Sequence, residues 1–384
     1  MTAAAPLPVD EATEDEAPLL DVRDLRTYFK TDDGIVRAVD GVSFSVRRGQ
    51  TLGVVGESGC GKSVSMLSIL NLNPKPGPLT LSGTSAPGAQ MEAFLRRTKK
   101  YVSVSTGQVR FRGEDILRAS NRRLREIRGS EVAMIFQDPM TSLNPVHSVG
   151  DQLIEAVMLH RDVSRRQARD LAVEGLEEVG IPRADRRIDD YPHQFSGGMR
   201  QRVMIAMALI NEPDVLIADE PTTALDVTTQ AQILGLINTL QEERGTAVVM
   251  ITHDLGVVAE VADEVVVMYA ARVAEQAPVD ELFERPRHPY TWGLLGSLPR
   301  LEVEVERLTQ IVGQPPSLLR PPPGCRFHPR CTYAFERCVR ELPEAVPAPH
   351  DPTHLDACFL DEITKREESR RLVTALALDD EGAR

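Results

Sequence analysis

Aromatic residues are scarce in this sequence, and an excess of basic charge and long apolar runs are absent. Phe, Trp and Tyr make up 4% of its 384 residues. Lys and Arg total 44 against 57 Asp and Glu, so the formal net charge is −13 and a broad polyanion-binding surface is not expected. No run of 18 apolar residues occurs, because the longest candidate, 203–218, is interrupted by Asn211, Glu212, Pro213 and Asp214. The composition therefore argues against a membrane-spanning chain and against a nucleic-acid partner.

The N-terminal segment also lacks the features of a secretory signal. It is acidic, contains three prolines and has neither a basic nor an apolar region of the kind that signals carry. Residues 1–18 are expected to form a disordered acidic tail. We place the protein on the cytoplasmic side of the cell, where thiols stay reduced, so its five cysteines are expected to be free or metal-bound.

Between residues 19 and 277, short apolar runs alternate with longer helical periods. This order predicts an α/β fold with βαβ units and a mainly parallel sheet. Several of the expected strands lack alternation, as strands covered on both faces do. The predicted strands are 36–44, 51–55, 131–136, 214–218, 247–252 and 264–268, and the predicted helices are 63–72, 149–159, 165–179, 199–210, 228–243 and 255–262.

Two segments do not show this alternation of apolar runs and helical periods. Residues 80–107 are rich in Ser, Gly and Thr and include Arg96, Arg97, Lys99 and Lys100. They are interpreted as an exposed insertion or as a contact site for a partner or for anionic lipid headgroups. After residue 277 prolines recur, which predicts a C-terminal appendage, 278–384, with little regular structure.

Residues 56–63 match the phosphate-binding loop (P-loop) pattern G-x4-G-K-S/T, and they follow an apolar run and open a helix. Glycines let successive N–H groups point at phosphate oxygens, and the helix N-terminus adds its dipole. Lys62 is predicted to reach the β- and γ-phosphates and Ser63 to bind Mg²⁺, whereas Cys60 is expected to pack. The predicted nucleotide-binding residues here are Gly56, Glu57, Ser58, Gly59, Cys60, Gly61, Lys62, Ser63 and Val64.

Polar residues also follow two other predicted strands. Asp219 and Glu220 end the run 214–218, at the edge where parallel sheets bind ligands. Asp219 is predicted to hold Mg²⁺, and Glu220 to orient and deprotonate an attacking water. His253 follows the run 247–252 and is expected to position that water near the γ-phosphate.

A serine and two glycines, Ser196, Gly197 and Gly198, precede the predicted helix 199–210. They form a helix cap with exposed N–H groups, a second potential phosphate site. One nucleotide does not easily reach both Ser196 and Ser63, which lie 133 residues apart on different elements. We therefore predict that this loop closes over the nucleotide held by the P-loop of a second subunit.

The order of these motifs resembles that of ATP-binding cassette (ABC) transporter ATPases over residues 19–277. The resemblance implies an ABC-type nucleotide-binding domain with a P-loop core sheet, an antiparallel β subdomain and a helical subdomain at about 139–195. It implies that Gln137 joins Glu220 and His253 in catalysis and joins Ser63 and Asp219 at Mg²⁺. It also implies nucleotide contacts by Ser196, Gly197, Gly198, Met199 and Asp226, and adenine stacking by Phe29 or Tyr28. The family signature has Gln where this chain has Met199, a substitution that we do not interpret as inactivating.

Residues 136–145, 195–202 and 288–290 narrow the resemblance to the peptide/nickel import ATPases. This implies ATP hydrolysis that powers import of dipeptides or oligopeptides from the cytoplasmic face of the membrane. The implied partners are two integral membrane permeases, an extracytoplasmic binding protein and a second ATPase subunit, identical or different. The alternatives are the same role for nickel or another small solute, a soluble ABC ATPase acting on nucleic acid or ribosomes, and a redox-sensing regulator. The acidic composition argues against nucleic acid, and Glu220 and His253 argue against a non-hydrolysing role.

Four cysteines in the appendage form a second candidate site. Cys325, Cys331, Cys338 and Cys358 are spaced C-x5-C-x6-C-x19-C, without the short C-x2–4-C of common zinc sites. Four thiolates can hold an iron–sulfur cluster or zinc, or they can remain unliganded thiols. The resemblance to peptide-import ATPases implies a 4Fe–4S cluster, and His328, His350 and His354 are candidates to replace one ligand.

Overall fold

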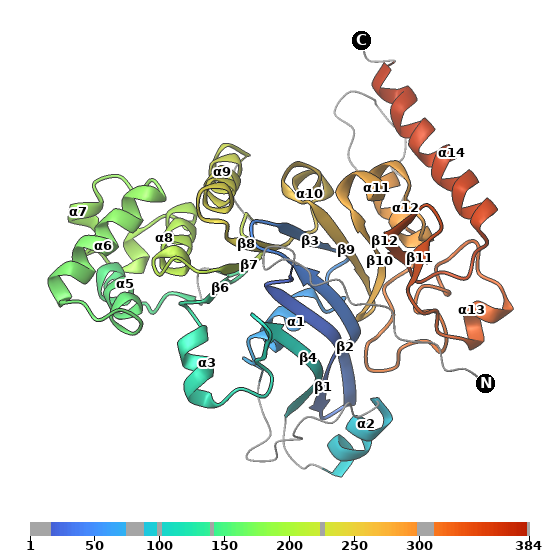
Figure 1. Cartoon of the computed structure of the whole chain (residues 1–384), viewed down its shortest axis with the longest axis horizontal. Coiled ribbons are helices and arrows are strands. Elements are labelled where there is room, and N and C mark those ends of the chain that lie inside the picture. Colours follow the sequence, from blue (N-terminus) through green and yellow to red (C-terminus); the bar gives the residue numbers. More distant parts are fainter. Residues whose placement is uncertain are drawn as a thin grey trace, which may run out of the picture.

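The structure is a computed structural model that describes residues 17–73, 88–97, 102–138, 142–222, 227–297 and 311–381. These residues form two sheets with helices packed around them (Figure 1). The larger sheet has eight strands in the order β11-β12-β10-β9-β3-β8-β7-β6. The smaller has four, in the order β2-β1-β4-β5.

Five neighbouring strands of the larger sheet are parallel, and they position the P-loop and the polar residues predicted to act with it. They are β9 (Glu264–Tyr269), β3 (Thr51–Val55), β8 (Ala247–Ile251), β7 (Val215–Asp219) and β6 (Val132–Ile135). Strands β3, β7 and β8 are buried along their whole length, which explains their continuous apolar sequence. The prediction of an α/β fold with a mainly parallel sheet is therefore confirmed.

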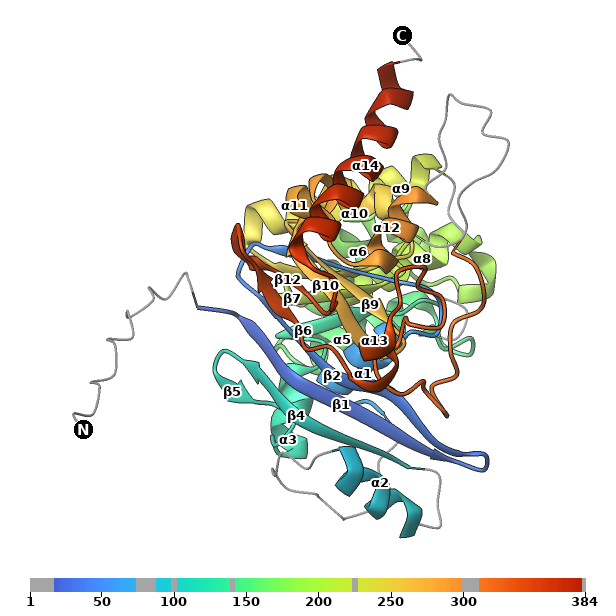
Figure 2. The same ribbon diagram turned by 90° about the vertical axis from the view of Figure 1, so that its right-hand side faces the viewer.

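The smaller sheet is antiparallel and packs on the larger one through helix α1 (Lys62–Ile69) and a shared core (Figure 2). Met66 and Ile69 of α1 are fully buried in this core, together with side chains from both sheets. The strands are β1 (Leu20–Thr31), β2 (Gly34–Val46), β4 (Ser103–Phe111) and β5 (Glu114–Asp115). The predicted strand 36–44 thus belongs to this sheet and not to the parallel one.

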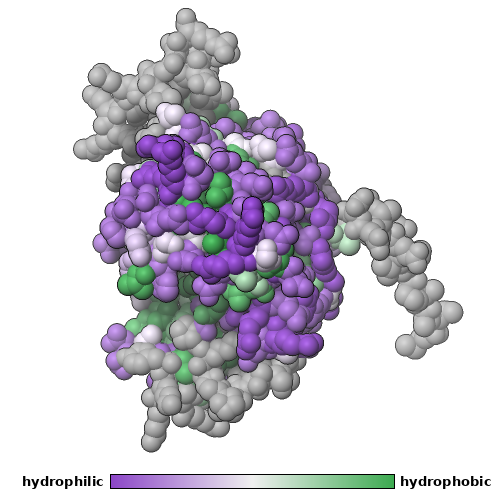
Figure 3. All heavy atoms as spheres, turned by 90° about the vertical axis from the view of Figure 1, so that its left-hand side faces the viewer, coloured by the Kyte–Doolittle hydropathy of each residue, from purple (hydrophilic) through white to green (hydrophobic). Residues whose placement is uncertain are grey.

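Helices α5–α8 form a lobe whose apolar core is continuous with side chains of β6, β7 and β8. Serines start three of them, because their hydroxyls accept hydrogen bonds from the first-turn N–H groups: Ser148 for α5, Ser164 for α6 and Ser196 for α8. Figure 3 faces this end of the molecule and shows a mostly hydrophilic surface with separate hydrophobic spots. The helices are α5 (Val149–Met158), α6 (Arg165–Glu178), α7 (Ala184–Arg187) and α8 (Gly197–Leu209), and a 3₁₀ turn lies at Pro192–Gln194.

Three more helices complete the central part. They are α3 (Asn121–Ile127), α9 (Val227–Arg244) and α10 (Leu255–Val261). All six predicted helices and all six predicted strands are present. Within the described ranges, none of the helices combines the length and the apolar character that a bilayer crossing requires.

The interpretation of residues 80–107 as an exposed insertion is wrong for part of the segment that the structure describes. Helix α2 (Gly88–Arg97) lies in this segment, and β4 begins at Ser103. Met91 and Leu95 of α2 are fully buried and pack near Tyr28, so the helix is part of a small core. The helix is only ten residues long, so its helical period is hard to recognise within a segment that is rich in Ser, Gly and Thr overall. Residues 80–87 and 98–101, with Lys99 and Lys100, lie outside the described residues.

The expectation of little regular structure after residue 277 is also wrong. The larger sheet continues from β10 (Arg272–Pro278) into β12 (Asp351–Asp356) and β11 (Val346–Ala348). The helices are α11 (Val279–Glu284), α12 (Pro289–Gly296), α13 (Glu336–Arg340) and α14 (Glu362–Glu381), and α14 projects from the body in both ribbon views. Proline does not exclude regular structure here: Pro289 is the first residue of α12, where its missing N–H costs nothing, and Pro347 lies within β11.

Candidate active site

The P-loop connects β3 to α1 and has no room for side chains at two of its glycines. Gly56 has φ 145°, and a Cβ there would lie 2.2 Å from the carbonyl oxygen of Met268. Gly61 has φ 103°, and its Cβ would lie 2.2 Å from the carbonyl oxygen of Ala38. Only glycine fits this backbone path, which curls around the start of α1. Ser58 and Gly59 at the tip of the loop are exposed.

Cys60 points into the core from the P-loop. It is 4% exposed, and burial raises the pKa of its thiol. A neutral buried thiol behaves as a small apolar side chain. The structure therefore favours the packing role that the sequence indicated for Cys60.

Lys62 folds back across the P-loop from the first residue of α1. Its side chain is buried, and Nζ donates to the carbonyl oxygens of Gly56 at 2.6 Å and Glu57 at 3.2 Å. These carbonyls belong to the loop itself. The ammonium group is therefore held inside the curve of the loop, where the sequence predicts the phosphates.

Two of the three predicted Mg²⁺ ligands, Ser63 and Asp219, meet although they lie 156 positions apart in the sequence. The Ser63 hydroxyl donates to Oδ1 of Asp219 at 3.0 Å. Burial raises the pKa of Asp219, against the opposing effects of this hydrogen bond and of the Lys62 charge. A buried carboxylate that is costly to ionise gains from a nearby cation.

Glu220, Gln137 and His253 converge beyond the carboxyl ends of β7, β6 and β8. Gln137 Nε2 donates to Oε2 of Glu220 at 3.0 Å, and His253 Nδ1 lies 3.6 Å from Oε1. Both carboxylate oxygens of Glu220 thus have a partner from a neighbouring strand end. The backbone of Glu220 has φ 49°, a strained conformation for this residue type that places its side chain at the turn.

The second predicted phosphate site opens α8 in the helical lobe. Ser196 and Gly197 are exposed, and a Cβ on Gly197 would meet nothing within 4 Å. The Ser196 hydroxyl accepts from the N–H of Met199, which caps the helix. The loop is thus open to a partner, and its contact with the nucleotide of a second subunit stays a prediction. Asp226 lies outside the described residues.

Of the two aromatic residues proposed for adenine stacking, Tyr28 is excluded. It is 2% exposed, and its hydroxyl donates to Oδ1 of Asp40 at 2.6 Å. Burial, together with the hydrogen bond to the Asp40 carboxylate and its charge, raises the pKa of Tyr28 to about 12. Phe29 follows it on β1, is only half-buried, and remains the candidate.

Two residues of the C-terminal part also hold the P-loop through contacts with Glu57. Arg330, in the C-terminal part, forms two hydrogen bonds with the Glu57 carboxylate, of 2.6 Å and 3.0 Å. A third bond runs from Arg330 to the hydroxyl of Tyr269 at 3.2 Å. The hydroxyl of the fully buried Tyr290 accepts the N–H of Glu57 at 2.9 Å. The motif at 288–290 pointed to Tyr290, but no local pattern marked Arg330.

The four appendage cysteines lie close together as free thiols. Cys325 donates its N–H to the carbonyl oxygen of Cys338 at 2.8 Å. Burial raises the pKa of Cys331 to about 11 and that of Cys358 to about 12, and the charge of Cys325 adds to both. The structure thus gathers four thiols from segments up to 33 positions apart in the sequence. His328 contacts the carbonyl oxygen of Cys325, whereas His350 and His354 lie beside Glu281.

Comparison with protein families gives two matches. The ABC transporter family model matches residues 39–104 and 91–223. A second model, the oligopeptide/dipeptide transporter C-terminal region, matches residues 274–338. The second match begins at β10 and covers α11, α12, Arg330 and three of the four clustered cysteines.

Curated relatives match along most of the chain. A probable peptide ABC transporter ATP-binding protein of Sinorhizobium fredii is 52% identical over 89% of this chain and 94% of its own length. The dipeptide transport ATP-binding protein DppD of Bacillus subtilis is 50% identical, over 85% of this chain and 90% of its own. The oligopeptide transport ATP-binding protein OppD of Escherichia coli is 46% identical, over 93% and 96%.

Solved structures match the central part. The dimeric structure of MJ0796, a bacterial ABC transporter cassette, has a TM-score of 0.55 at 25% identity and covers 68% of this chain and 98% of its own. A dimeric post-hydrolysis state of the same cassette bound to ADP and Pi has a TM-score of 0.56, with the same identity and coverage.

Proposed function

The chain belongs to the ABC transporter ATP-binding proteins with an oligopeptide/dipeptide transporter C-terminal region, and from this premise we propose that it hydrolyses ATP to power import of dipeptides or oligopeptides. The observation that carries the proposal is the convergence of Lys62, Ser63, Asp219 and Glu220 at one edge of the parallel sheet. The C-terminal region and the names of the relatives favour peptides over nickel as the solute.

Glu220 is proposed as the general base that orients and deprotonates the attacking water. Gln137 and His253 face its two carboxylate oxygens, so that the carboxylate is oriented before substrate arrives. Lys62 and the P-loop N–H groups are proposed to bind the phosphates and to neutralise charge that develops in the transition state. Catalysis here is mostly positioning and electrostatics.

Ser63, Asp219 and Gln137 are the proposed Mg²⁺ ligands, directly or through water. A hydroxyl and a carboxylate that already lie 3.0 Å apart supply the oxygen atoms that Mg²⁺ prefers. When bound, Mg²⁺ neutralises charge on the β- and γ-phosphates. The remaining proposed contacts are Phe29 with adenine and, from a second ATPase subunit, Ser196, Gly197, Gly198, Met199 and Asp226 with the nucleotide.

The chain is proposed to act at the cytoplasmic face of the membrane with two permease subunits, a second ATPase subunit and an extracytoplasmic binding protein. The helical lobe is the proposed permease contact. Val146, Met158 and Leu159 are exposed there, beside a cavity of about 500 Å³ that Met158 and Leu159 line with His147 and Ile154. Exposed apolar side chains around a concave surface favour protein contact.

The four cysteines are proposed to hold a metal centre. Four free thiols, one buried and three partly buried, offer the ligands that an iron–sulfur cluster takes. Tetrahedral zinc with Zn–S of about 2.3 Å places thiolates about 3.8 Å apart. In the described part of the chain, no three of these thiols lie within 4.8 Å of one another. The spacing of the cysteines along the chain, which lacks the short C-x2–4-C of common zinc sites, supports an iron–sulfur cluster over zinc.

The test is steady-state ATPase activity of the assembled transporter with Glu220→Gln, compared with Glu243→Gln at an exposed position on α9. Loss of a base should lower kcat by about 10²–10⁴ while ATP still binds. Lys62→Ala should differ by weakening ATP binding itself, since it removes a charge from the phosphates. Activity of Glu220→Gln within about threefold of wild type would refute the role of Glu220. Failure of peptides to stimulate the wild-type complex would refute peptide import.

A further inference from the structure

Three metal-ligating side chains meet in the C-terminal part, apart from the cysteines and from the active site. Glu281 lies on α11, His350 directly precedes β12, and His354 lies within β12. One ligand atom from each of the three lies within 4.8 Å of the other two. Imidazole and carboxylate together suit divalent transition metals.

One ring nitrogen of His354, Nδ1, faces Glu281 without a hydrogen-bond partner. The side chain of His354 is fully buried, and Nε2 lies 2.7 Å from Oε1 of the equally buried Glu275. Glu275 also accepts the backbone N–H groups of Arg287 at 2.7 Å and His288 at 2.8 Å, so it acts as a carboxylate acceptor. Nε2 of His354 therefore donates to Glu275. Nδ1 is then the ring nitrogen that faces Glu281 and is placed to bind a metal ion.

That Nδ1 has no hydrogen-bond partner, although it is buried, and it lies 3.9 Å from Oε2 of Glu281. Buried polar atoms nearly always have a hydrogen-bond or metal partner. A buried nitrogen without one that faces a carboxylate therefore indicates a ligand between the two groups. A histidine that donates its other ring N–H to a carboxylate is the usual arrangement of a metal ligand.

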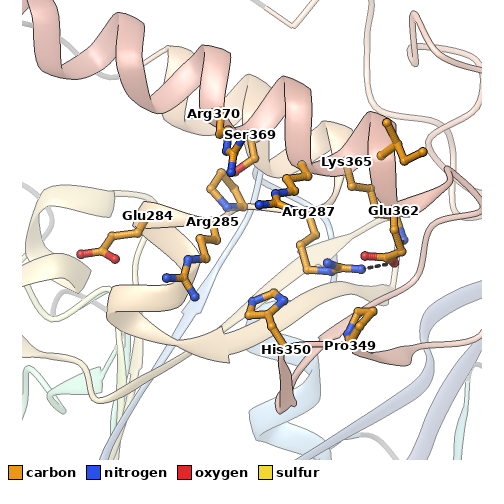
Figure 4. A pocket seen from close by; sticks show the side chains of 12 residues that line it. Glu284, Arg285, Arg287, Pro349, His350, Glu362, Lys365, Ser369 and Arg370 are labelled. Atoms are coloured by element: carbon orange, nitrogen blue, oxygen red, sulfur yellow. Dashed lines mark hydrogen bonds and ion pairs between the residues drawn. The ribbon is translucent and has the colours of Figure 1, made fainter.

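His350 completes the group from the solvent side. Its Nε2 lies 3.0 Å from the same Oε2 of Glu281, while Oε1 of Glu281 is held by Arg285 at 3.1 Å. A cation between the three residues would take the place of the direct contact between His350 and Glu281. His350 also lines a surface pocket of about 580 Å³, shown in Figure 4, so the group is reached from solvent.

We propose that Glu281, His350 and His354 bind one divalent transition-metal ion of the zinc type, with a further position left to water. Two histidines and one glutamate with an open position form a known zinc ligand set. The ion joins α11 to the β11–β12 hairpin. This hairpin pairs with β10 at only two positions, Glu275 with Asp356 and Gln276 with Leu355, so a cross-link there stabilises a short sheet edge. The proposal stands independently of ATP hydrolysis.

The experiment is a Co²⁺ titration of the full chain after removal of metals, followed by visible absorption and by thermal unfolding with Zn²⁺. Nitrogen and oxygen ligands give Co²⁺ d–d bands without the thiolate charge-transfer band that the cysteines would add. His350→Ala should weaken the Co²⁺ affinity of this site by about tenfold or more and abolish the Zn²⁺-induced rise of the Tm. His147→Ala, in the helical lobe, is the matched control and should leave both unchanged.

Glu281→Gln keeps the shape of the side chain but removes its charge, and it should weaken binding in the same way. Equal Co²⁺ affinity in wild type, His350→Ala and Glu281→Gln would overturn the proposal. So would a Co²⁺ spectrum with thiolate charge transfer and no separate nitrogen/oxygen site.

Discussion

Replacing Arg330 by Ala should weaken ATP binding while leaving the rate of the chemical step largely intact. The Arg330 side chain is 6% exposed and forms a two-pronged ion pair with Glu57 of the P-loop. Burial lowers the pKa of Arg330, but hydrogen bonds to Glu57 and Tyr269 outweigh this and raise it, so the guanidinium is charged when it contacts the loop.

The magnitude follows from the contacts that are lost. Hydrogen bonds to charged groups contribute about 1.5–3 kcal/mol each. The Glu57 side chain is 24% exposed, which screens the pair and favours the lower end, about 2–3 kcal/mol for the whole fork. The N–H bond from Glu57 to Tyr290 survives and retains part of the loop geometry. We therefore expect about 1–2 kcal/mol to appear in nucleotide binding, a rise in KM for ATP of about 5- to 30-fold.

The assay is steady-state ATPase of the assembled complex, with KM and kcat determined separately for wild type, Arg330→Ala, Glu57→Gln and the double variant. Because the two residues act as a pair, the double variant should be little worse than either single one. Arg330→Lys should recover only part of the loss, since an ammonium cannot form the fork. Arg337→Ala, which breaks an exposed ion pair with Glu341 and a contact with the Phe359 ring away from the P-loop, is the control.

Two results would refute this reasoning. One is a KM for Arg330→Ala within about twofold of that for Arg337→Ala, because the fork would then not shape the loop. The other is a fall in kcat with unchanged KM, which would place Arg330 in the chemical step.

Two further predictions follow from charged and sulfur groups outside the active site. Anaerobically purified protein should contain about four irons per chain, and Ser at Cys325, Cys331, Cys338 or Cys358 should remove them; protein with neither iron nor zinc would leave these residues as reduced thiols. Burial raises the pKa of Asp40, but the Tyr28 hydroxyl and the charges of Arg272, Arg26 and Arg326 outweigh it and lower the pKa. Its contribution is then fully present above the unfolded pKa of about 3.9 and is lost as pH falls through the folded value, so the stability deficit of Asp40→Asn in urea unfolding should be largest near neutral pH and shrink below about pH 4.

The parallel sheet could be predicted because burial on both faces leaves a simple trace in the sequence. The antiparallel sheet was harder for a physical reason. β1 pairs with β2 through several register shifts, for example between Val22 and Leu25, and these bulges interrupt the alternation that marks a strand. β4 begins Ser-Val-Ser-Thr-Gly, which resembles a loop by composition although Ser and Thr fit the inner positions beside β1.

In the active site, too, some residues could be predicted from the sequence and others could not. Lys62, Ser63, Asp219 and Glu220 were found because each follows a strand at a fixed spacing, and parallel strands bring such positions to one edge. The fork between Arg330 and Glu57 joins residues 273 positions apart, so no local spacing could indicate it. His354 likewise gained meaning only when the fold placed Glu275 on one side of its ring and Glu281 on the other.

The C-terminal part is tied to the cassette by two arginines from one short turn. Arg326 donates to Asp40 at 2.8 Å, and Asp40 also binds Arg26 of β1 and Arg272 of β10. Arg330, four residues later, holds the P-loop. Cys325 directly precedes the first arginine and Cys331 directly follows the second. A metal centre that held Cys325 and Cys331 in place would therefore also hold the guanidinium groups of Arg326 and Arg330 in place. A displacement of this turn would break the contact of Arg326 with Asp40 and that of Arg330 with Glu57 of the P-loop. Both changes would be destabilising, because an unpaired buried charge is costly.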